Sequence, residues 1–354
     1  MTSSVIASLS TRLIRIPLTR PWGPDVPGVS VIQVAVTDSA GLTGYGFSWT
    51  PSIGATAVKA LLDADITAFA VGRVADTSWW ADAWRHLHEA GGGGITTIAL
   101  AGVDLALWDL AARRAGVGLP ELLGRRHESL ETYGSGVNLH YPPAELVAQA
   151  QRWVDAGFRA VKVKVGKPEL SEDVDRLQAV RSVVGPDVSL MVDANQRWDL
   201  PRAIAAVAAF EPLDIAWLEE PLRADDLRGH VELKRETGVR IAVGENVHTE
   251  YRFAEWIDAG AADVLQPNVI RVGGITPALR IASLVQDAGK ELAFHLLPEL
   301  SAQLAFAVPG VTRVEVVESA GFAELGALAA PTGLEFRDGR VAGGPALGLG
   351  MMFG

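Results

Sequence analysis

The feature that most constrains the fold of this chain is a repeat that begins near residue 130. Short apolar runs rich in β-branched residues alternate there with amphipathic segments of helical length. The runs read ETYGSGVN, RAVKVKV, SLMVD, IAWLEE, RIAVGE, ADVLQPN, ELAFH and RVEVV. Strands that alternate with helices in this way form βαβ units and a parallel sheet. Eight strands are the number that closes a (β/α) barrel.

The segments on either side of the repeat have different patterns. Residues 31–47 contain two apolar runs around a Ser-Ala-Gly turn, which predicts a β-hairpin, and residues 55–123 have apolar residues at helical spacing. After residue 318 the repeat stops, and a short strand pair and a Gly-rich tail follow. We therefore predict an N-terminal α+β domain over residues 1–125, a barrel over residues 126–318 and a C-terminal segment over residues 319–354.

Composition excludes several classes of partner and site. The formal net charge of -11 disfavours nucleic acid or an anionic membrane surface as a partner, because both require a basic face. The absence of cysteine excludes disulfides and thiolate metal sites, so that any metal must be held by oxygen or imidazole. The sequence has no signal-peptide pattern and no apolar run long enough to cross a membrane. We expect a cytoplasmic protein.

Polar side chains end successive strands of the repeat. They are separated by 29, 26, 26, 23, 27 and 20 residues, and they are Lys164, Asp193, Glu219, Glu245, Asn268, His295 and Glu315. The carboxyl ends of barrel strands build the active site in this architecture. We therefore expect these side chains to line one rim.

Three carboxylates end the third to fifth strands, at Asp193, Glu219 and Glu245. Neighbouring strands lie roughly 4.8 Å apart, so the three side chains can meet. Crowded carboxylates repel one another unless a cation lies between them, and all-oxygen ligation selects Mg²⁺ or Mn²⁺ over zinc. We predict one such ion per chain. The alternative is that the three residues form salt bridges on the rim.

Lys162 and Lys164 share one face of the second strand, because side chains alternate along a strand. An inward ammonium beside a divalent cation has a lowered pKa, which suits a general base. The alternative is a pair of structural ion-pair lysines. His295 lies on the seventh strand, across the barrel from the lysines, and its position on the rim favours a catalytic role over a structural one.

The motifs together resemble the mandelate racemase subgroup of the enolase superfamily, over nearly the whole chain. They read VKVKVG, MVDANQ, WLEEP, VGENV, QPNVIRVGGIT, AFHLLPELSA and RVEVVE. The resemblance implies a modified TIM barrel of (β/α)7β type with an N-terminal α+β capping domain that the C-terminal tail completes. It also implies Mg²⁺ bound by the three carboxylates, removal of the α-proton of a carboxylate substrate, and an enediolate intermediate.

The resemblance assigns roles to individual residues. Lys164 matches the lysine base, and Lys162 matches the lysine that contacts the substrate carboxylate. His295 matches the base or acid on the opposite face, and Glu315 matches the acid that hydrogen-bonds a carboxylate oxygen. Asn195 matches a polar residue near the substrate.

The capping loops add weaker candidates for substrate binding. Trp22 and Trp49 lie in loops that the family's capping domain places over the site, so we expect them in the pocket wall. Asn138 and His140, at the end of the first barrel strand, are further candidates. The resemblance also implies a homo-oligomer.

Asn268 departs from the family pattern, in which this position is usually an aspartate. An Asn carbonyl can still accept a hydrogen bond from Nδ1–H of His295 and fix its tautomer. The change removes a negative charge about 3 to 4 Å from the ring, on the order of 4 kcal/mol at an effective dielectric constant of about 20. We expect His295 to be neutral more of the time at pH 7, which impairs racemisation more than dehydration.

The leading hypothesis for function is an acid-sugar dehydratase that converts a small polyhydroxy carboxylate to a 2-keto-3-deoxy acid. The alternative within the same chemistry is a racemase or epimerase of a 2-hydroxy acid. An aldolase-type barrel would instead use Lys162 or Lys164 to form a Schiff base. A non-catalytic binding protein on an inherited barrel is the remaining possibility.

Overall fold

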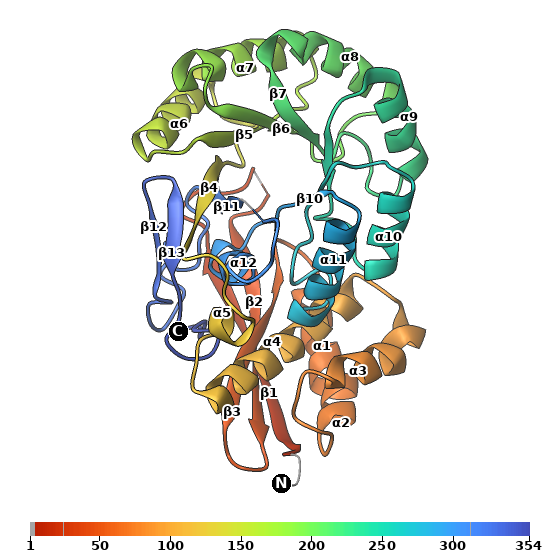
Figure 1. Cartoon of the computed structure of the whole chain (residues 1–354), viewed down its shortest axis with the longest axis vertical. Coiled ribbons are helices and arrows are strands. Elements are labelled where there is room, and N and C mark those ends of the chain that lie inside the picture. The colour runs from red at the N-terminus through yellow and green to blue at the C-terminus, as the bar shows by residue number, and fades with distance from the viewer. Residues whose placement is uncertain (1–3, 24, 312) are drawn as a thin grey trace.

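The computed structural model describes residues 4–23, 25–311 and 313–354. A barrel of alternating strands and helices occupies the upper part of Figure 1, and an antiparallel sheet with its own helices lies below it. The predicted repeat is confirmed, because eight parallel strands are found in the described residues. They are β4 Ser129–Ser135, β5 Ala160–Lys164, β6 Ser189–Asp193, β7 Ile215–Glu219, β8 Ile241–Val243, β9 Val264–Leu265, β10 Glu291–Leu292 and β11 Arg313–Val317.

The strands pair in chain order from β4 to β10, and β11 pairs with β4 in parallel. A parallel bridge between Leu292 and Val311 closes the cylinder between β10 and β11. A helix follows each strand from β4 to β10, and in the described residues none follows β11 directly, which gives the (β/α)7β pattern. The helices are α6 Pro143–Asp155, α7 Leu170–Val184, α8 Leu200–Phe210, α9 Leu227–Thr237, α10 Glu250–Asp258, α11 Ile275–Asp287 and α12 Pro298–Ala305, with the 3₁₀ turn η3 Glu211–Leu213 after α8.

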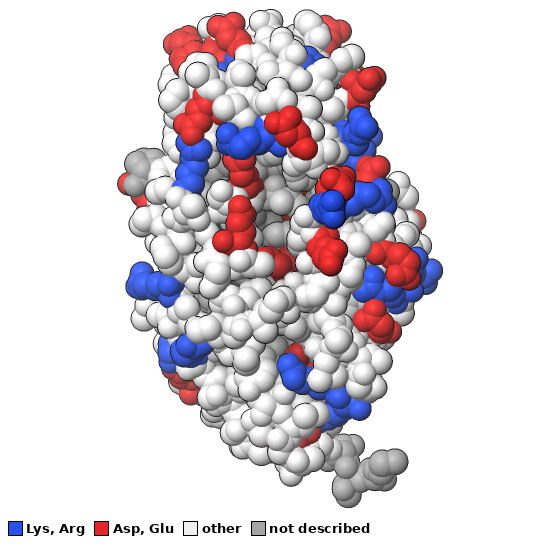
Figure 2. Space-filling view, turned by 90° about the vertical axis from the view of Figure 1, so that its left-hand side faces the viewer, with Lys and Arg blue, Asp and Glu red and all other residues white. Residues whose placement is uncertain are grey.

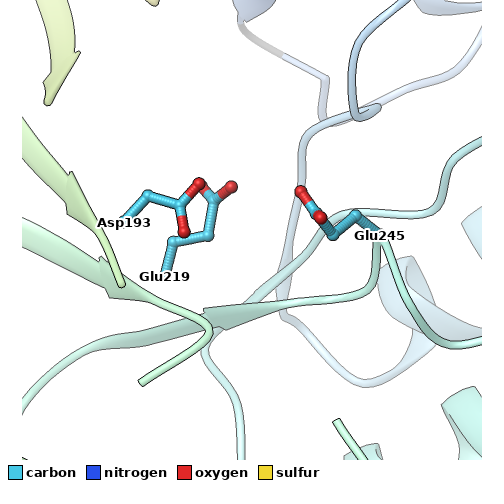
Figure 3. A group of neighbouring side chains, drawn as sticks. All are labelled: Asp193, Glu219 and Glu245. Carbon is cyan, nitrogen blue, oxygen red and sulfur yellow. The ribbon is translucent and has the colours of Figure 1, made fainter. Parts of the chain in front are cut away.

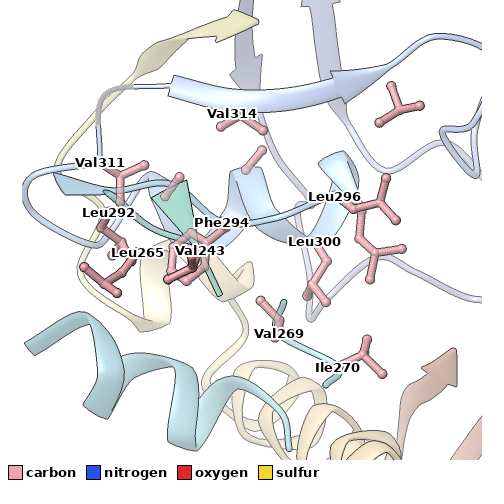
Figure 4. Close-up of a cluster of buried hydrophobic side chains, with 14 of the residues drawn as sticks. Val243, Leu265, Val269, Ile270, Leu292, Phe294, Leu296, Leu300, Val311 and Val314 are labelled. Carbon is pink, nitrogen blue, oxygen red and sulfur yellow. The ribbon is translucent and has the colours of Figure 1, made fainter. Parts of the chain in front are cut away.

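Alternation along the strands separates the core from the site. In β5, Val161 and Val163 are buried on the helix side, whereas Lys162 and Lys164 point into the barrel. Apolar side chains on the outward faces of other strands pack against the helices, and Figure 4 shows part of this layer. The strand ends are therefore free to carry polar groups toward the barrel axis.

The N-terminal part, here called the cap, contains the antiparallel sheet β1 to β3 and several helices. Its strands are β1 Ile6–Pro17, β2 Gly28–Asp38 and β3 Thr43–Thr50. Its helices are α1 Ala55–Leu61, η1 Leu62–Ile66, α2 Thr67–Ala70, α3 Trp79–Leu87, η2 His88–Ala90, α4 Ile95–Ala115 and α5 Leu119–Leu122. The predicted hairpin is β2–β3, with Thr37 opposite Thr43.

Helix α4 packs directly on β3. A Cβ added at Gly46 would lie 2.3 Å from the carbonyl oxygen of Gly102, so glycine permits this close approach. By length and composition α4 could cross a membrane, but 78% of its most apolar window is buried within the protein. In this structure α4 is a core helix.

The C-terminal tail joins the two parts. Its hairpin, β12 Leu334–Arg337 and β13 Arg340–Gly343, pairs with β4 of the barrel. Phe353 then packs edge-on against Phe47 of β3 and Phe322, at ring-centroid distances of 5.2 and 5.0 Å. The predicted strand pair is thus present, and the tail contributes to the core that the cap shares with the barrel.

Charged side chains are mixed on the molecular face in Figure 2. Acidic residues lie around a hollow near its centre, and basic residues lie among and beside them. On this face the acidic side chains are therefore interspersed with basic ones, although the sequence as a whole has a net negative charge.

Candidate active site

Three carboxylates converge at the strand ends of the barrel. Asp193 ends β6, Glu219 ends β7 and Glu245 follows β8, and ligand oxygens of the three lie within 4.8 Å of one another. Figure 3 shows Glu245 facing the other two across a gap. Burial raises the pKa of Glu219 to about 7, with Lys162 opposing the effect and Asp193 adding to it. A buried all-oxygen cluster of this kind fits a divalent cation such as Mg²⁺.

The two inward lysines contact these carboxylates. Lys162 Nζ lies 2.6 Å from Glu219 Oε1 and 2.8 Å from Glu315 Oε1, and Lys164 contacts Asp193. Burial, the largest single effect, lowers the pKa of Lys164, but the carboxylates of Asp193, Glu245 and Glu219 together outweigh it, and the net shift is upward. The Asp193 carboxylate contacts the ammonium directly, and the lowered pKa expected for this lysine beside a bound cation remains a prediction.

Glu315 lies beside Lys162 on the last barrel strand. Its Oε2 accepts a hydrogen bond of 2.8 Å from the backbone N–H of Leu296. Burial, the largest single effect, raises the pKa of Glu315, but Lys162, His295 and Lys164 together lower it to about 2. Glu315 is therefore a carboxylate here, and the acid role implied by the family remains a prediction.

His295 and Asn268 are joined by a hydrogen bond of unexpected polarity. Asn268 Oδ1 accepts bonds of 3.1 Å from the backbone N–H groups of Ile270 and Arg271, so the amide NH₂ faces the ring, with Nδ2 3.2 Å from Nδ1. Nδ1 must then be an acceptor, and the ring carries its proton on Nε2, 2.7 Å from Glu245 Oε2. Our expectation that the Asn carbonyl accepts from Nδ1–H was wrong, because backbone groups already occupy that carbonyl.

A cavity of about 180 Å³ lies among these groups, between the cap and the barrel. Its walls contain Trp22, Trp49, Pro51, Ser135, Val137, Lys164, Asn195, Glu245, Arg271, His295, Leu296, Glu315 and Val317. The rings of Trp22 and Trp49 are 6.4 Å apart and meet at 64°. The structure thus places both tryptophans and Asn195 in the wall, with Asn195 Nδ2 3.3 Å from Asp193 Oδ2.

Two candidates from the sequence do not line this cavity. Asn138 is fully buried; its Oδ1 accepts from the backbone N–H of Lys164 at 2.9 Å, and its Nδ2 donates to Gln149 at 2.8 Å. His140 packs edge-on against Tyr141, at a centroid distance of 4.9 Å. We therefore correct their assignment: Asn138 supports the end of β5 because its amide is consumed there, and His140 lies outside the cavity wall.

Sequence reasoning missed Arg271 and Glu220. Arg271 lines the cavity and donates to the backbone carbonyl of Glu245 at 3.0 Å. Glu220 is 1% exposed, and burial, then Glu245 and Asp193, raise its pKa to about 9. Asn246 Nδ2 lies 3.0 and 2.9 Å from its two carboxyl oxygens. In the sequence, Glu220 is the second glutamate of WLEEP and Arg271 is the arginine of NVIRVGG, so both lie in motifs that end barrel strands.

A larger cavity of about 510 Å³ lies outside the barrel, against the outward faces of β4 and β11. Its walls include Phe158, Glu299 and Phe336. None of the polar residues at the strand ends borders it in the described structure. The smaller cavity is therefore the candidate active site.

Comparison with protein families matches both parts of the chain. Residues 24–124 match the model described as mandelate racemase / muconate lactonizing enzyme, N-terminal domain. Residues 145–353 match the model described as enolase C-terminal domain-like. These matches cover most of the cap, most of the barrel and the tail.

Individual relatives span nearly the same length. The chain is 38% identical over 317 residues to 3,6-anhydro-alpha-L-galactonate cycloisomerase from Streptomyces coelicolor, covering 88% of each. It is 34% identical over 290 residues to L-talarate/galactarate dehydratase from Salmonella typhimurium, covering 79% of this chain and 71% of the relative. A crystal structure of a racemase from Streptomyces coelicolor with bound magnesium superimposes with a TM-score of 0.92 at 36% identity, covering 99% of this chain and 97% of that chain.

Proposed function

The chain belongs to the mandelate racemase and muconate lactonizing enzyme family of the enolase superfamily, and on that premise we propose that it dehydrates an acid sugar to a 2-keto-3-deoxy acid. The chemistry of the family is Mg²⁺-dependent removal of the α-proton of a carboxylate substrate through an enediolate. The step that follows proton removal decides between a lyase and an isomerase. That step depends on the residues opposite Lys164, chiefly His295.

The first step uses Lys164 and the carboxylate cluster. Asp193, Glu219 and Glu245 would hold Mg²⁺, which when bound stabilises the negative charge that develops on the substrate carboxylate. Lys164 lines the cavity and takes the α-proton. Lys162 lies behind it, 1% exposed, and adds a fixed positive charge near the developing anion.

One observation supports dehydration as the second step: the Asn268 amide lies 3.2 Å from Nδ1 of His295. This contact leaves the imidazole of His295 neutral, with its proton on Nε2 at the cavity wall. Such a ring donates a hydrogen bond, as a neutral imidazole can, but does not accept a proton at that nitrogen. His295 thus assists a departing β-hydroxyl; the hydroxide takes a proton from solvent, and Lys164 releases one to close the balance.

The second candidate is an isomerase, because the relative that is 38% identical is a cycloisomerase. Racemisation of a 2-hydroxy acid would require a base on the His295 face, which the Asn268 hydrogen bond opposes. A Schiff base at Lys162 is disfavoured by its burial and by its ion pairs with Glu219 and Glu315.

The test is a screen of purified, Mg²⁺-saturated protein against mono- and diacid sugars. A dehydratase produces a 2-keto acid that a carbonyl reagent detects and that is lighter than the substrate by one water. An isomerase that opens a ring ether at the β-carbon also produces a keto acid, but one of unchanged mass, and a racemase gives the epimer with solvent deuterium at the α-carbon and no keto acid. Lys164→Met is the matched control and should abolish both signals. Activity that survives chelator, or a substrate trapped on lysine by borohydride, would contradict the proposal.

Cellular location and assembly remain predictions. We propose a cytoplasmic enzyme that acts on a small carboxylate, which the burial of α4 within the protein supports. A homo-oligomer follows from the family resemblance alone, and size-exclusion chromatography with light scattering would test it.

A further inference from the structure

Three side chains of the cap bind the loop between β9 and α11, here called the 268–276 loop. Trp80 Nε1 donates to the carbonyl oxygen of Gly273 at 2.8 Å. Asp104 Oδ2 accepts from the backbone N–H of Thr276 at 2.9 Å, and Asp104 Oδ1 accepts from its hydroxyl at 2.6 Å. Trp108 Nε1 donates to the same hydroxyl at 3.0 Å. The cap thus holds a loop of the barrel through direct hydrogen bonds that are buried or partly buried.

Asp104 takes the place of a helix cap that α11 lacks. Helices α8, α9 and α10 begin with their own capping side chains, Asp199, Asp226 and Thr249. In the described chain no side chain of the α11 segment caps that helix, whose N-cap residue is Gly274. Asp104 of the cap instead accepts a hydrogen bond from the N–H of Thr276 in the first turn of this helix.

Gly274 makes this contact possible. Its φ of +115° suits glycine, and an added Cβ would lie 2.3 Å from Asp104 Oδ2. Asp104 itself is fully buried, and burial raises its pKa to about 7. Its two hydrogen bonds to Thr276 offset part of the cost of burying this carboxyl.

The same loop fixes the amide of Asn268. The N–H of Val272 donates to the carbonyl oxygen of Asn268 at 3.0 Å, and the N–H of Gly274 donates to Val269 at 2.8 Å. The Asn268 side-chain oxygen accepts from Ile270 and Arg271 within the loop. The loop is therefore one hydrogen-bonded turn, held by the cap at its far end and presenting Asn268 at its near end.

We propose that Asp104, assisted by Trp80 and Trp108, is a positioning residue through which the cap orients His295. The cap holds the 268–276 loop, the loop holds the Asn268 amide, and the amide keeps the His295 proton on Nε2. The cap therefore does more than cover the substrate: it sets the group opposite Lys164. The catalytic consequence, though not the geometry, rests on the proposed function.

A purely structural role for Asp104 makes a different prediction. Loss of a structural contact would lower stability and reduce every catalytic step alike. Loss of a positioning contact would spare proton removal by Lys164, which β5 carries, and would impair the step that His295 assists.

The test compares Asp104→Asn and Trp80→Phe with Asp109→Asn. Asp109 is a buried carboxylate on the same helix that accepts from the backbone N–H groups of Tyr45 and Leu349 at 2.8 and 2.6 Å, away from the 268–276 loop. Trp80→Phe removes the indole donor but keeps an aromatic ring, so it carries the test if Asp104→Asn does not fold.

The first readout needs no substrate. Long-range ¹H–¹⁵N NMR of the Mg²⁺-saturated protein reports the tautomer of each histidine, with His295→Gln assigning the signal. We expect one Nε2–H form in the wild type and in Asp109→Asn, and a mixed or broadened signal in Asp104→Asn and Trp80→Phe. An unchanged His295 signal in both cap variants would overturn the proposal, whatever the enzyme's reaction proves to be.

The second readout separates the two steps with an acid-sugar substrate. We expect exchange of the α-proton in deuterated water to change by less than about twofold in the cap variants. Keto-acid formation should fall by about tenfold or more, because small misplacement of a reacting group is costly. An equal fall in both rates would show a structural role only. Absence of both activities in the wild type would refute the proposed function and leave the NMR test standing.

Discussion

Replacing Asn268 by aspartate should reverse the hydrogen bond that it makes with His295. One carboxylate oxygen would still accept from the backbone N–H groups of Ile270 and Arg271. The other would take the place of the amide nitrogen and could only accept, so Nδ1 of the ring would have to carry a proton. Nε2 of a neutral ring would then present a lone pair to the cavity.

The magnitude follows from the observed separation. A unit charge 3.2 Å from Nδ1 interacts with it by about 5 kcal/mol at an effective dielectric constant of about 20. Desolvation of the new carboxylate offsets part of this. If only a third remains, about 1.7 kcal/mol, the fraction of rings protonated on Nδ1 rises more than tenfold.

The assay is solvent exchange at the α-carbon of both C2 epimers of an acid sugar, followed by ¹H NMR in deuterated water. We expect the wild type to exchange chiefly the epimer whose α-proton faces Lys164. Asn268→Asp should raise exchange of the other epimer at least about tenfold. The double variant Asn268→Asp/His295→Gln is the matched control and should lose the gain.

The reasoning fails if a folded Asn268→Asp protein shows normal exchange on the Lys164 face and no gain on the His295 face. Circular dichroism and Mg²⁺ binding would establish that the variant is intact. A gain that persists without the imidazole would also contradict it, because the new base would then be another group.

Further predictions concern stability. Burial raises the pKa of Asp104 from 3.8 to about 7, so the folded state binds a proton that the unfolded state has lost, and its contribution to stability falls by about 3 kcal/mol between pH 4 and 7. In urea unfolding, the stability of the wild type relative to Asp104→Asn should therefore be higher at pH 5 than at pH 8. Gly274→Ala should lower the free energy of unfolding by about 3 kcal/mol or more, because its Cβ would meet Asp104. The control Gly260→Ala, with φ of +64° and open space around the Cβ, should lower it by about 1 kcal/mol. Equal urea midpoints for the two variants would argue against the clash. Mg²⁺ at about 100 times its dissociation constant should stabilise the protein by about 2.7 kcal/mol, and chelator should lower the thermal midpoint again. The midpoint of Asp193→Asn, which loses a carboxylate of the cluster, should rise less when Mg²⁺ is added.

The arrangement of the strand-end residues could be predicted because it depends on periodicity. The strand repeat placed Asp193, Glu219 and Glu245 at one end of the barrel, and alternation within β5 placed both lysines inside. Both rules act over a few residues, so a single sequence is enough to apply them.

The orientation of the Asn268 amide could not be predicted, because it depends on backbone N–H groups in a turn whose conformation no local pattern specifies. Asn138 follows a strand as the true site residues do, yet its amide is consumed in holding β5. The contact between Asp104 and Thr276 joins residues 172 positions apart, on two parts of the protein, and no spacing rule reaches that far.

The position of Phe353 in the core that the cap shares with the barrel also bears on the order of folding. Its ring completes a cluster with Phe47 and Phe322, and Leu349 binds Asp109 of α4. During translation the cap strands emerge first, and the segment that completes their core emerges only after every barrel strand has been made. We therefore expect the Phe47 side of the cap sheet to stay exposed until the tail has been made, and the two parts to finish folding together.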